Sequence, residues 1–298
     1  MKITTTGLTI PHTGLRKQYN SLRNEILDVT DEVLRSGQLM DGNYTAEFEN
    51  WLARKNGVSY AVTCHSGTQA LEILASFYRD QDLAFVNPPT VVVPAMTYPA
   101  TANAFLRSGW QVIIADTDYY GQLDVRKLLN DMDTHYHAVC AVGLYGAALR
   151  DALPLLSRAI VIEDAAQHWL SNGCKRQGGA AAISFDPTKN FANFGNGGAI
   201  VSDDRNLLDY ARNWINNGKR GGHGETGTNS RMSEVDCAQM LVKTRYIDKW
   251  QARRRDIAEH WTERLRRKEN ITCLIDDSNR DGHCFHKFVI EKIGRAHV

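Results

Sequence analysis

The chain has 298 residues, of which 43% are hydrophobic and 23% are charged, as is ordinary for a globular protein. This length suffices for one large domain, or for one large and one small domain, with a substantial core. The formal net charge of +1 excludes a global field that would recruit nucleic acid or an anionic membrane. No apolar run reaches the length of a membrane span, and the first residues lack the apolar core of a signal peptide.

The cysteine and histidine spacings favour no metal site and no disulfide framework. His135-x-His137 and His283-x-x-His286 have metal-like spacing, but no neighbouring residue completes a ligand set, so we interpret them as surface or core histidines. The cysteines are scattered, which predicts reduced thiols in a cytoplasmic protein. They are Cys64, Cys140, Cys174, Cys237, Cys273 and Cys284.

Helical and strand patterns alternate along the chain. Apolar residues at steps of three, four and seven predict an amphipathic helix over 15–35, which ends at Ser36-Gly37. The next predicted elements are helices at 45–55, 68–77 and 99–107, and strands at 60–63, 90–93, 111–116, 138–142, 159–164, 181–185 and 198–201. Continuous apolar strands separated by helices predict an α/β fold, with a mostly parallel sheet between helices. Ligands of such sheets bind beyond the carboxyl ends of the strands.

The last part of the chain predicts a second, smaller unit. A long helix over 246–268 is followed by predicted strands at 271–275 and 284–290. We therefore expect a large domain over 1–245, and a linking helix with the beginning of an incomplete α+β domain over 246–291. Residues 292–298 are the translation of a DNA string that resembles a sequencing adapter, so we expect a non-native tail there; the alternative is a genuine polar tail.

Ser66-Gly67-Thr68 lies where a predicted strand passes into a helix. The free N–H groups and the positive dipole end of a helix start attract phosphate. Gly67 lets the backbone approach a ligand closely, and the Thr68 hydroxyl adds a donor. An ordinary helix N-cap explains the same residues, and this motif alone favours the N-cap.

Asp164 follows a predicted apolar strand, where its carboxylate would point at the ligand crevice. A carboxylate in that position suits a cofactor with a basic ring nitrogen, because the anion keeps the nitrogen protonated and makes the ring an electron sink. The alternative is an N-cap for the following helix. The residue by itself does not distinguish the two.

Lys189 lies in a nearly uncharged turn before Gly195-Asn196-Gly197-Gly198. Desolvation in such a turn would lower the pKa of the lysine and free its amine to form a Schiff base. The alternative is a surface lysine, which is the usual fate of this residue type.

The order of these features is more specific than each alone. The helix-start glycine comes first, then Asp164, and Lys189 follows 25 residues later with Ser184 five residues before it. This order is typical of fold-type-I pyridoxal phosphate (PLP) enzymes. Over about residues 15–265 the chain resembles the DegT/StrS-type sugar aminotransferase family. Further matching stretches are Pro94–Asn103, Leu144-Tyr145-Gly146, Glu163–Gln167 and Gly227–Glu234.

The resemblance implies a role for each matching residue at the cofactor ring. Lys189 would be the catalytic residue, bound covalently to PLP and moving the proton during the reaction. Asp164 would bind the pyridine nitrogen, and Gln167 would lie near the phenolic oxygen. Tyr98 would stack on the face of the ring.

The resemblance also implies a phosphate site and a shared substrate pocket. Gly67, Thr68 and Ser184 would hold the phosphate, and Asn229 would reach it from the other subunit of a homodimer. His65 and Trp169 are bulkier than the resemblance leads us to expect beside the cofactor. The positions expected near the substrate are Arg231, His65 and Trp169.

The implied function is transfer of an amino group from an amino acid, by resemblance glutamate, to a nucleotide-linked keto-sugar. Pyridoxamine phosphate would be formed between the two half reactions. Lysine at position 189 argues against the sugar-dehydratase branch, which has histidine there. The alternatives are a PLP-binding protein without turnover, because the second domain is incomplete, and another fold-type-I transaminase or lyase. Neither nucleic acid nor membrane is expected as a partner.

Overall fold

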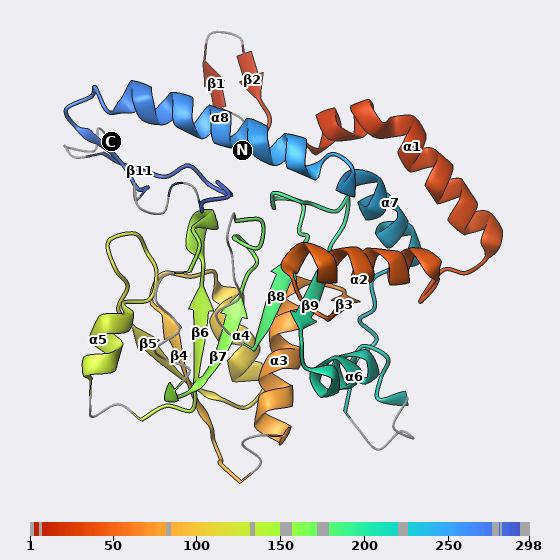
Figure 1. Cartoon of the computed structure of the whole chain (residues 1–298), viewed down its shortest axis with the longest axis horizontal. Helices are drawn as coiled ribbons and strands as arrows, with labels where there is room; N and C mark the ends of the chain where they lie inside the picture. The colour runs from red at the N-terminus through yellow and green to blue at the C-terminus, as the bar shows by residue number, and fades with distance from the viewer. Residues whose placement is uncertain are drawn as a thin grey trace.

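The computed structural model describes residues 3–5, 8–81, 85–131, 135–149, 157–171, 179–219, 226–275, 280 and 282–292. A seven-stranded sheet forms the centre of the chain, and helices pack on both of its faces (Figure 1). The predicted α/β class is therefore confirmed. Among the helices of the described residues, none combines the length and apolarity that are needed to cross a bilayer.

The central sheet has the strand order β3-β9-β8-β7-β6-β4-β5. Five neighbouring strands, from β8 to β5, run parallel, and β9 is antiparallel to both β8 and β3. The parallel strands end at one edge, where the sequence placed the ligand crevice. The strands are β3 (Tyr60–Cys64), β4 (Thr90–Pro94), β5 (Gln111–Ala115), β6 (Ala138–Val142), β7 (Ile160–Asp164), β8 (Ala180–Ser184) and β9 (Gly198–Ser202).

Alternate residues of the strands build a separate core on each face of the sheet. Val62, Ile162 and Ile200 pack with α3, α4 and α6 on one face. Ile183 and Val201 pack with α2 and α7 on the other face. The helices are α1 (Leu15–Ser36), α2 (Asn43–Asn56), α3 (Gly67–Gln81), α4 (Pro99–Arg107), α5 (Val125–Asn130), α6 (Arg205–Trp214), α7 (Glu234–Thr244) and α8 (Ile247–Leu265), with a single 3₁₀ turn, η1 (Leu144–Gly146).

The elements that the sequence predicted are present, with one exception. The predicted strand at 284–290 was wrong: β11 covers only Ile290–Lys292 and pairs with β10 (Ile271–Cys273). The preceding segment bonds to η1 instead, through Cys284 N to Gly146 O at 2.8 Å and Lys287 N to Tyr145 O at 3.0 Å. Phe285 has φ of 51°, which interrupts any extended run.

Several short elements were not predicted. They are the hairpin of β1 (Ile3–Thr5) and β2 (Leu8–Ile10), and the helices α5, α6 and α7. A sequence signal existed for the helices, because Asp124, Asp204 and Ser233 each accept a backbone hydrogen bond as the N-cap. Lys292 lies in β11, and the remainder of the expected non-native tail, 293–298, lies outside the described residues, as do Cys174 and His223.

Glu234, the first residue of α7, fixes the start of α2. Its carboxylate accepts hydrogen bonds from the backbone N–H groups of Gly42, Tyr44 and Thr45 at 2.9, 2.7 and 3.1 Å. A Cβ at position 42 would lie 2.5 Å from Glu234 Oε1, so any other residue would have to push this carboxylate aside. An anion at a helix start also interacts favourably with the helix dipole.

The other end of α7 carries Lys243, a lysine that is fully buried. Burial lowers its pKa to about 7, and the charge of Asp236 only partly opposes that effect. In the unfolded chain the same amine has an ordinary pKa of about 10.4. Between these two values the unfolded chain binds a proton that the folded chain does not, so the free energy of unfolding rises with pH.

We therefore expect the wild-type protein to gain stability relative to Lys243→Met as the pH increases from about 7 to about 10, by roughly 1 kcal/mol per pH unit. Urea unfolding of both proteins across this range measures the difference. Lys249→Met, which removes an exposed lysine of α8, is the control and should show no such trend. A wild-type advantage that falls as pH rises would contradict the lowered pKa.

Candidate active site

A cavity of about 690 Å³ opens at the carboxyl edge of the parallel strands. The start of α3, the ends of β7 and β8, η1 and the segment before β11 form its walls. The structure brings these sequence-predicted residues together in the lining: His65, Gly67, Thr68, Tyr98, Asp164, Gln167, Ser184 and Lys189. Ser66, Thr97, Tyr145, Asp186, His286 and Lys287 also line the cavity.

Asp164 is the last residue of β7, and its carboxylate is buried at the floor of the cavity. Oδ2 accepts a hydrogen bond of 2.7 Å from the hydroxyl of Thr101 in α4, and Oδ1 accepts one of 3.1 Å from Ala166 N. A buried carboxylate needs such donors or a cation. Thr101 was missed as a site residue, although it belongs to the stretch Pro94–Asn103 that carries the resemblance.

The start of α3 lies directly against the end of β8. A Cβ at Gly67 would lie 2.7 Å from the Ser184 Cβ, so only glycine allows this approach. Ser66 caps the helix, because its Oγ accepts a hydrogen bond from Gln69 N at 3.1 Å. Within the described parts of the chain, the N–H groups of Gly67 and Thr68 have no acceptor, and both residues line the cavity. The N-cap at Ser66 is therefore compatible with an anion site at the same helix start.

Lys189 lies in the turn that follows β8, with its backbone N–H bonded to Asp186 O at 2.8 Å. Asp186 shapes this turn, since its Oδ1 accepts hydrogen bonds from the N–H and the hydroxyl of Thr188 at 2.9 and 2.6 Å. Burial lowers the pKa of the Lys189 amine, and the carboxylates of Asp164 and Asp186 partly counteract it. A larger share of neutral amine makes this lysine a better nucleophile and base.

The C-terminal segment closes the side of the cavity beside Gln167. Gln167 Oε1 accepts a hydrogen bond from Tyr145 N at 2.8 Å, and its backbone carbonyl accepts one from Cys284 Sγ at 3.1 Å. Burial, reinforced by the charges of Lys189 and Lys287, lowers the pKa of His286 to about 3. His286 is thus a neutral imidazole in the cavity wall; the sequence had indicated only a surface or core histidine.

Three sequence-predicted residues do not line the cavity. Trp169, which we expected near the substrate, is a core side chain instead, and its ring lies 6.1 and 5.7 Å from those of Phe185 and Phe191. Arg231 pairs with Asp41 at 3.1 Å and contacts Asn229 Oδ1 at 3.4 Å. Arg231 and Asn229 lie in the loop before α7, outside the lining of this chain's own cavity.

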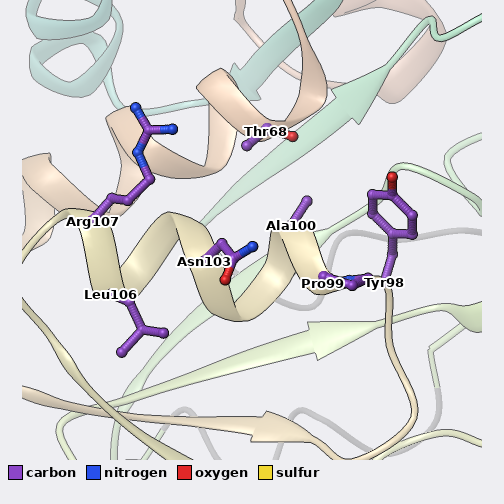
Figure 2. A pocket seen from close by; sticks show the side chains of 7 residues that line it. All are labelled: Thr68, Tyr98, Pro99, Ala100, Asn103, Leu106 and Arg107. Atoms are coloured by element: carbon purple, nitrogen blue, oxygen red, sulfur yellow. The ribbon is translucent and has the colours of Figure 1, made fainter.

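A second hollow of about 440 Å³ adjoins the first and shares Thr68, Tyr98 and Ala100 with it. Figure 2 shows Tyr98 just before α4, with its ring projecting away from the helix, and Thr68 facing α4 from the neighbouring α3. Tyr98 is 67% exposed, so its ring is available to stack on a planar ligand. Arg107, at the far end of this hollow, pairs with Glu72 at 2.8 Å.

The fold and this edge of the sheet are those of fold-type-I PLP-dependent enzymes, and the sequence specifies the group within them. It matches the DegT/DnrJ/EryC1/StrS aminotransferase family over residues 20–296, and the chain belongs to that family. It is 30% identical to the pleiotropic regulatory protein of Geobacillus stearothermophilus over 300 residues, 95% of this chain and 78% of that protein. It is also 30% identical to the dTDP-3-amino-3,4,6-trideoxy-alpha-D-glucose transaminase of Streptomyces venezuelae, over 85% of this chain and 68% of the relative.

A solved structure confirms the same architecture. DesV of S. venezuelae, in complex with a ketimine intermediate, superimposes with a TM-score of 0.84 at 28% identity. The match covers 95% of this chain and 78% of DesV.

The cavity residues fit PLP, the cofactor of this family. A buried carboxylate at Asp164 suits a protonated ring nitrogen, and the free N–H groups at Gly67 and Thr68 suit a phosphate. The half-buried Lys189 amine, with its lowered pKa, suits an aldehyde. Described His, Cys, Asp and Glu side chains form no group of three that would hold a metal ion instead.

Removing the Thr101 hydroxyl should weaken cofactor binding, because Asp164 would lose a buried hydrogen bond. A bond to a charged group contributes about 1.5–3 kcal/mol, so Thr101→Val should raise the Kd for PLP by roughly 10- to 100-fold. Thr101→Ser, which keeps the hydroxyl, should bind nearly as the wild type does. Fluorescence titration with PLP measures both, and equal affinity of the Val and Ser variants would refute the role of this contact.

Proposed function

We propose that this protein transfers an amino group from an amino acid, with glutamate as the expected donor, to a keto-sugar linked to a nucleotide. The observation that carries the proposal is a lysine amine of lowered pKa that shares one cavity with a buried carboxylate and a helix start. The names of the relatives support the substrate class. They include a dTDP-sugar transaminase, a UDP-sugar aminotransferase of Pseudomonas aeruginosa and a GDP-perosamine synthase of Escherichia coli.

Bound PLP would supply an electron sink that stabilises negative charge on the substrate carbon. The chain's own residues would orient it: Asp164 would hold the ring nitrogen, and Gly67, Thr68 and Ser184 would hold the phosphate. Tyr98 would cover one face of the ring. Lys189 takes the proton from the substrate carbon of the donor and returns a proton to the carbon of the acceptor. The lowering of its pKa suits both roles, because it moves the pKa towards the working pH, where an acid–base group works best.

A homodimer completes the proposed site. Asn229 and Arg231 lie outside the lining of this chain's cavity, so they would contribute to a site by reaching that of a second copy. Subunits of Lys189→Ala and Asn229→Ala, each weakly active alone, would then restore activity when mixed.

The reduced cysteines of the described residues, among them Cys64 and Cys140, support the proposed cytoplasmic location.

The central test is absorbance. Addition of PLP to the purified protein should give a visible band from the cofactor bound to Lys189, and Lys189→Ala should abolish it. Lys249→Ala, an exposed lysine of α8, should leave the band intact. A persistent band in Lys189→Ala would refute the assignment of this residue.

The half reaction tests turnover. Glutamate should remove the visible band of the wild-type protein, and a nucleotide-linked keto-sugar should restore it. A band that no amino donor removes would indicate a PLP-binding protein without turnover. Restoration by simple keto acids, and not by nucleotide keto-sugars, would indicate another fold-type-I transaminase.

A further inference from the structure

The turn that carries Lys189 belongs to a loop that is closed upon itself. Phe185 N donates to Gly197 O at 2.8 Å, and Asn193 N donates to Phe185 O at 2.7 Å. The loop between these bonds has Lys189 on its cavity side and Phe191 in the core on the other side. A shift in the second half of this loop therefore displaces the Lys189 amine.

Helix α7 contacts the second half of this loop through two side chains. Lys243 Nζ donates a hydrogen bond of 2.7 Å to Ala192 O and lies 3.5 Å from the centre of the Phe194 ring. Asp236 Oδ1 accepts a hydrogen bond of 2.8 Å from the amide of Asn193. The two α7 residues are seven positions apart and so lie on one face of the helix. Three consecutive residues of the loop, 192–194, are thus contacted by two side chains of one helix.

The buried location of Lys243 lowers the stability of the fold. Its side chain is fully buried, and burial disfavours the charged amine. A methionine would fill the same space without that cost. A lysine has the advantage that it donates a hydrogen bond to the Ala192 carbonyl. Without this donor, the carbonyl would be buried next to apolar side chains.

Charges and rings around Lys243 come from three directions. Asp236 faces it along α7, and its charge acts on the Lys243 pKa. Phe194 covers the amine from the loop, and Tyr19 of α1 packs edge-on against Phe194 with ring centres 6.0 Å apart. The amine thus sits at a defined ring and hydrogen-bond contact in a packed environment, and a cation–π attraction is added whenever the amine is protonated.

We propose that Lys243 is a positioning residue, which holds the loop of residues 192–194 so that the Lys189 amine points into the cavity. This inference rests on the function proposed for Lys189. Lys243 itself does not reach the cavity lining. Its loss should therefore affect the proton-transfer step more than substrate binding, because small misplacements of a catalytic group lower the rate strongly.

The test compares Lys243→Met with Lys243→Gln, which keeps a hydrogen-bond donor. For Lys243→Met we expect kcat to fall about 10-fold or more, the KM for the amino donor to stay within about twofold, and the pH titration of the Lys189-bound cofactor band to shift. Lys243→Gln should recover part of the wild-type kcat and part of the wild-type pH titration of the band. Wild-type kcat and an unshifted band in folded Lys243→Met would overturn the proposal.

One control and one further variant separate the positioning role from a loss of stability. Leu207→Ala opens a cavity under α6 on the opposite face of the sheet, so it should destabilise the fold while kcat, measured well below its unfolding temperature, stays unchanged. Phe194→Leu removes the ring beneath the Lys243 amine and should lower kcat in the same direction, so it tests the proposal should Lys243→Met fail to fold. An unchanged kcat in Phe194→Leu, with Lys243→Met unfolded, would also overturn it.

The outcome is distinguishable from failure of the proposed function. If Lys189→Ala keeps the visible band, the function assigned to Lys189 fails, whatever Lys243 does. If Lys189→Ala loses the band while Lys243→Met behaves as the wild type, only the positioning role fails.

Discussion

The close approach of α3 to the end of β8 is the constraint on which the site depends. Gly67 lies against Ser184, and no side chain fits between them. The contact sets the helix start at the edge of the sheet, so that its free N–H groups face the same cavity as Asp164 and Lys189. Parallel strands make this geometry possible, because their carboxyl ends and the helix starts that follow them share one edge.

The cavity keeps a carboxylate and an amine close to each other at little exposure to water. Asp164 is satisfied by Thr101 and a backbone N–H, so it does not need Lys189 as a permanent ion-pair partner. Burial in turn lowers the pKa of Lys189, and the two nearby carboxylates only partly oppose this effect. The arrangement separates an anion that is held in place from an amine that is free to react.

Much of this could be read from the sequence, because the relevant signals are local. Apolar runs such as 138–142 predicted strands, and the spacing of Gly67, Asp164 and Lys189 placed these three residues at one sheet edge. The misses depend on tertiary contacts. Trp169 follows the strand that ends in Asp164, but its large ring is turned back into an aromatic cluster.

His286 is a second residue whose position depends on tertiary contacts, here contacts that bring it into the cavity. It lies in a run that reads as a strand, yet bonds to η1, more than a hundred residues earlier in the chain, carry it into the cavity wall. Thr101 was likewise inside a recognised stretch, but only the three-dimensional structure shows that its hydroxyl meets Asp164. Local patterns cannot rank the residues of such a stretch by what they touch.

The segment from Cys284 to Lys287 has a consequence for biosynthesis. It supplies one wall of a cavity whose other walls come from the first two thirds of the chain. Domains generally fold from the N-terminus as the ribosome releases them. The sheet edge with Gly67, Asp164 and Lys189 therefore emerges well before this wall does. During synthesis this side of the cavity therefore stays open until residues 284–287 have emerged.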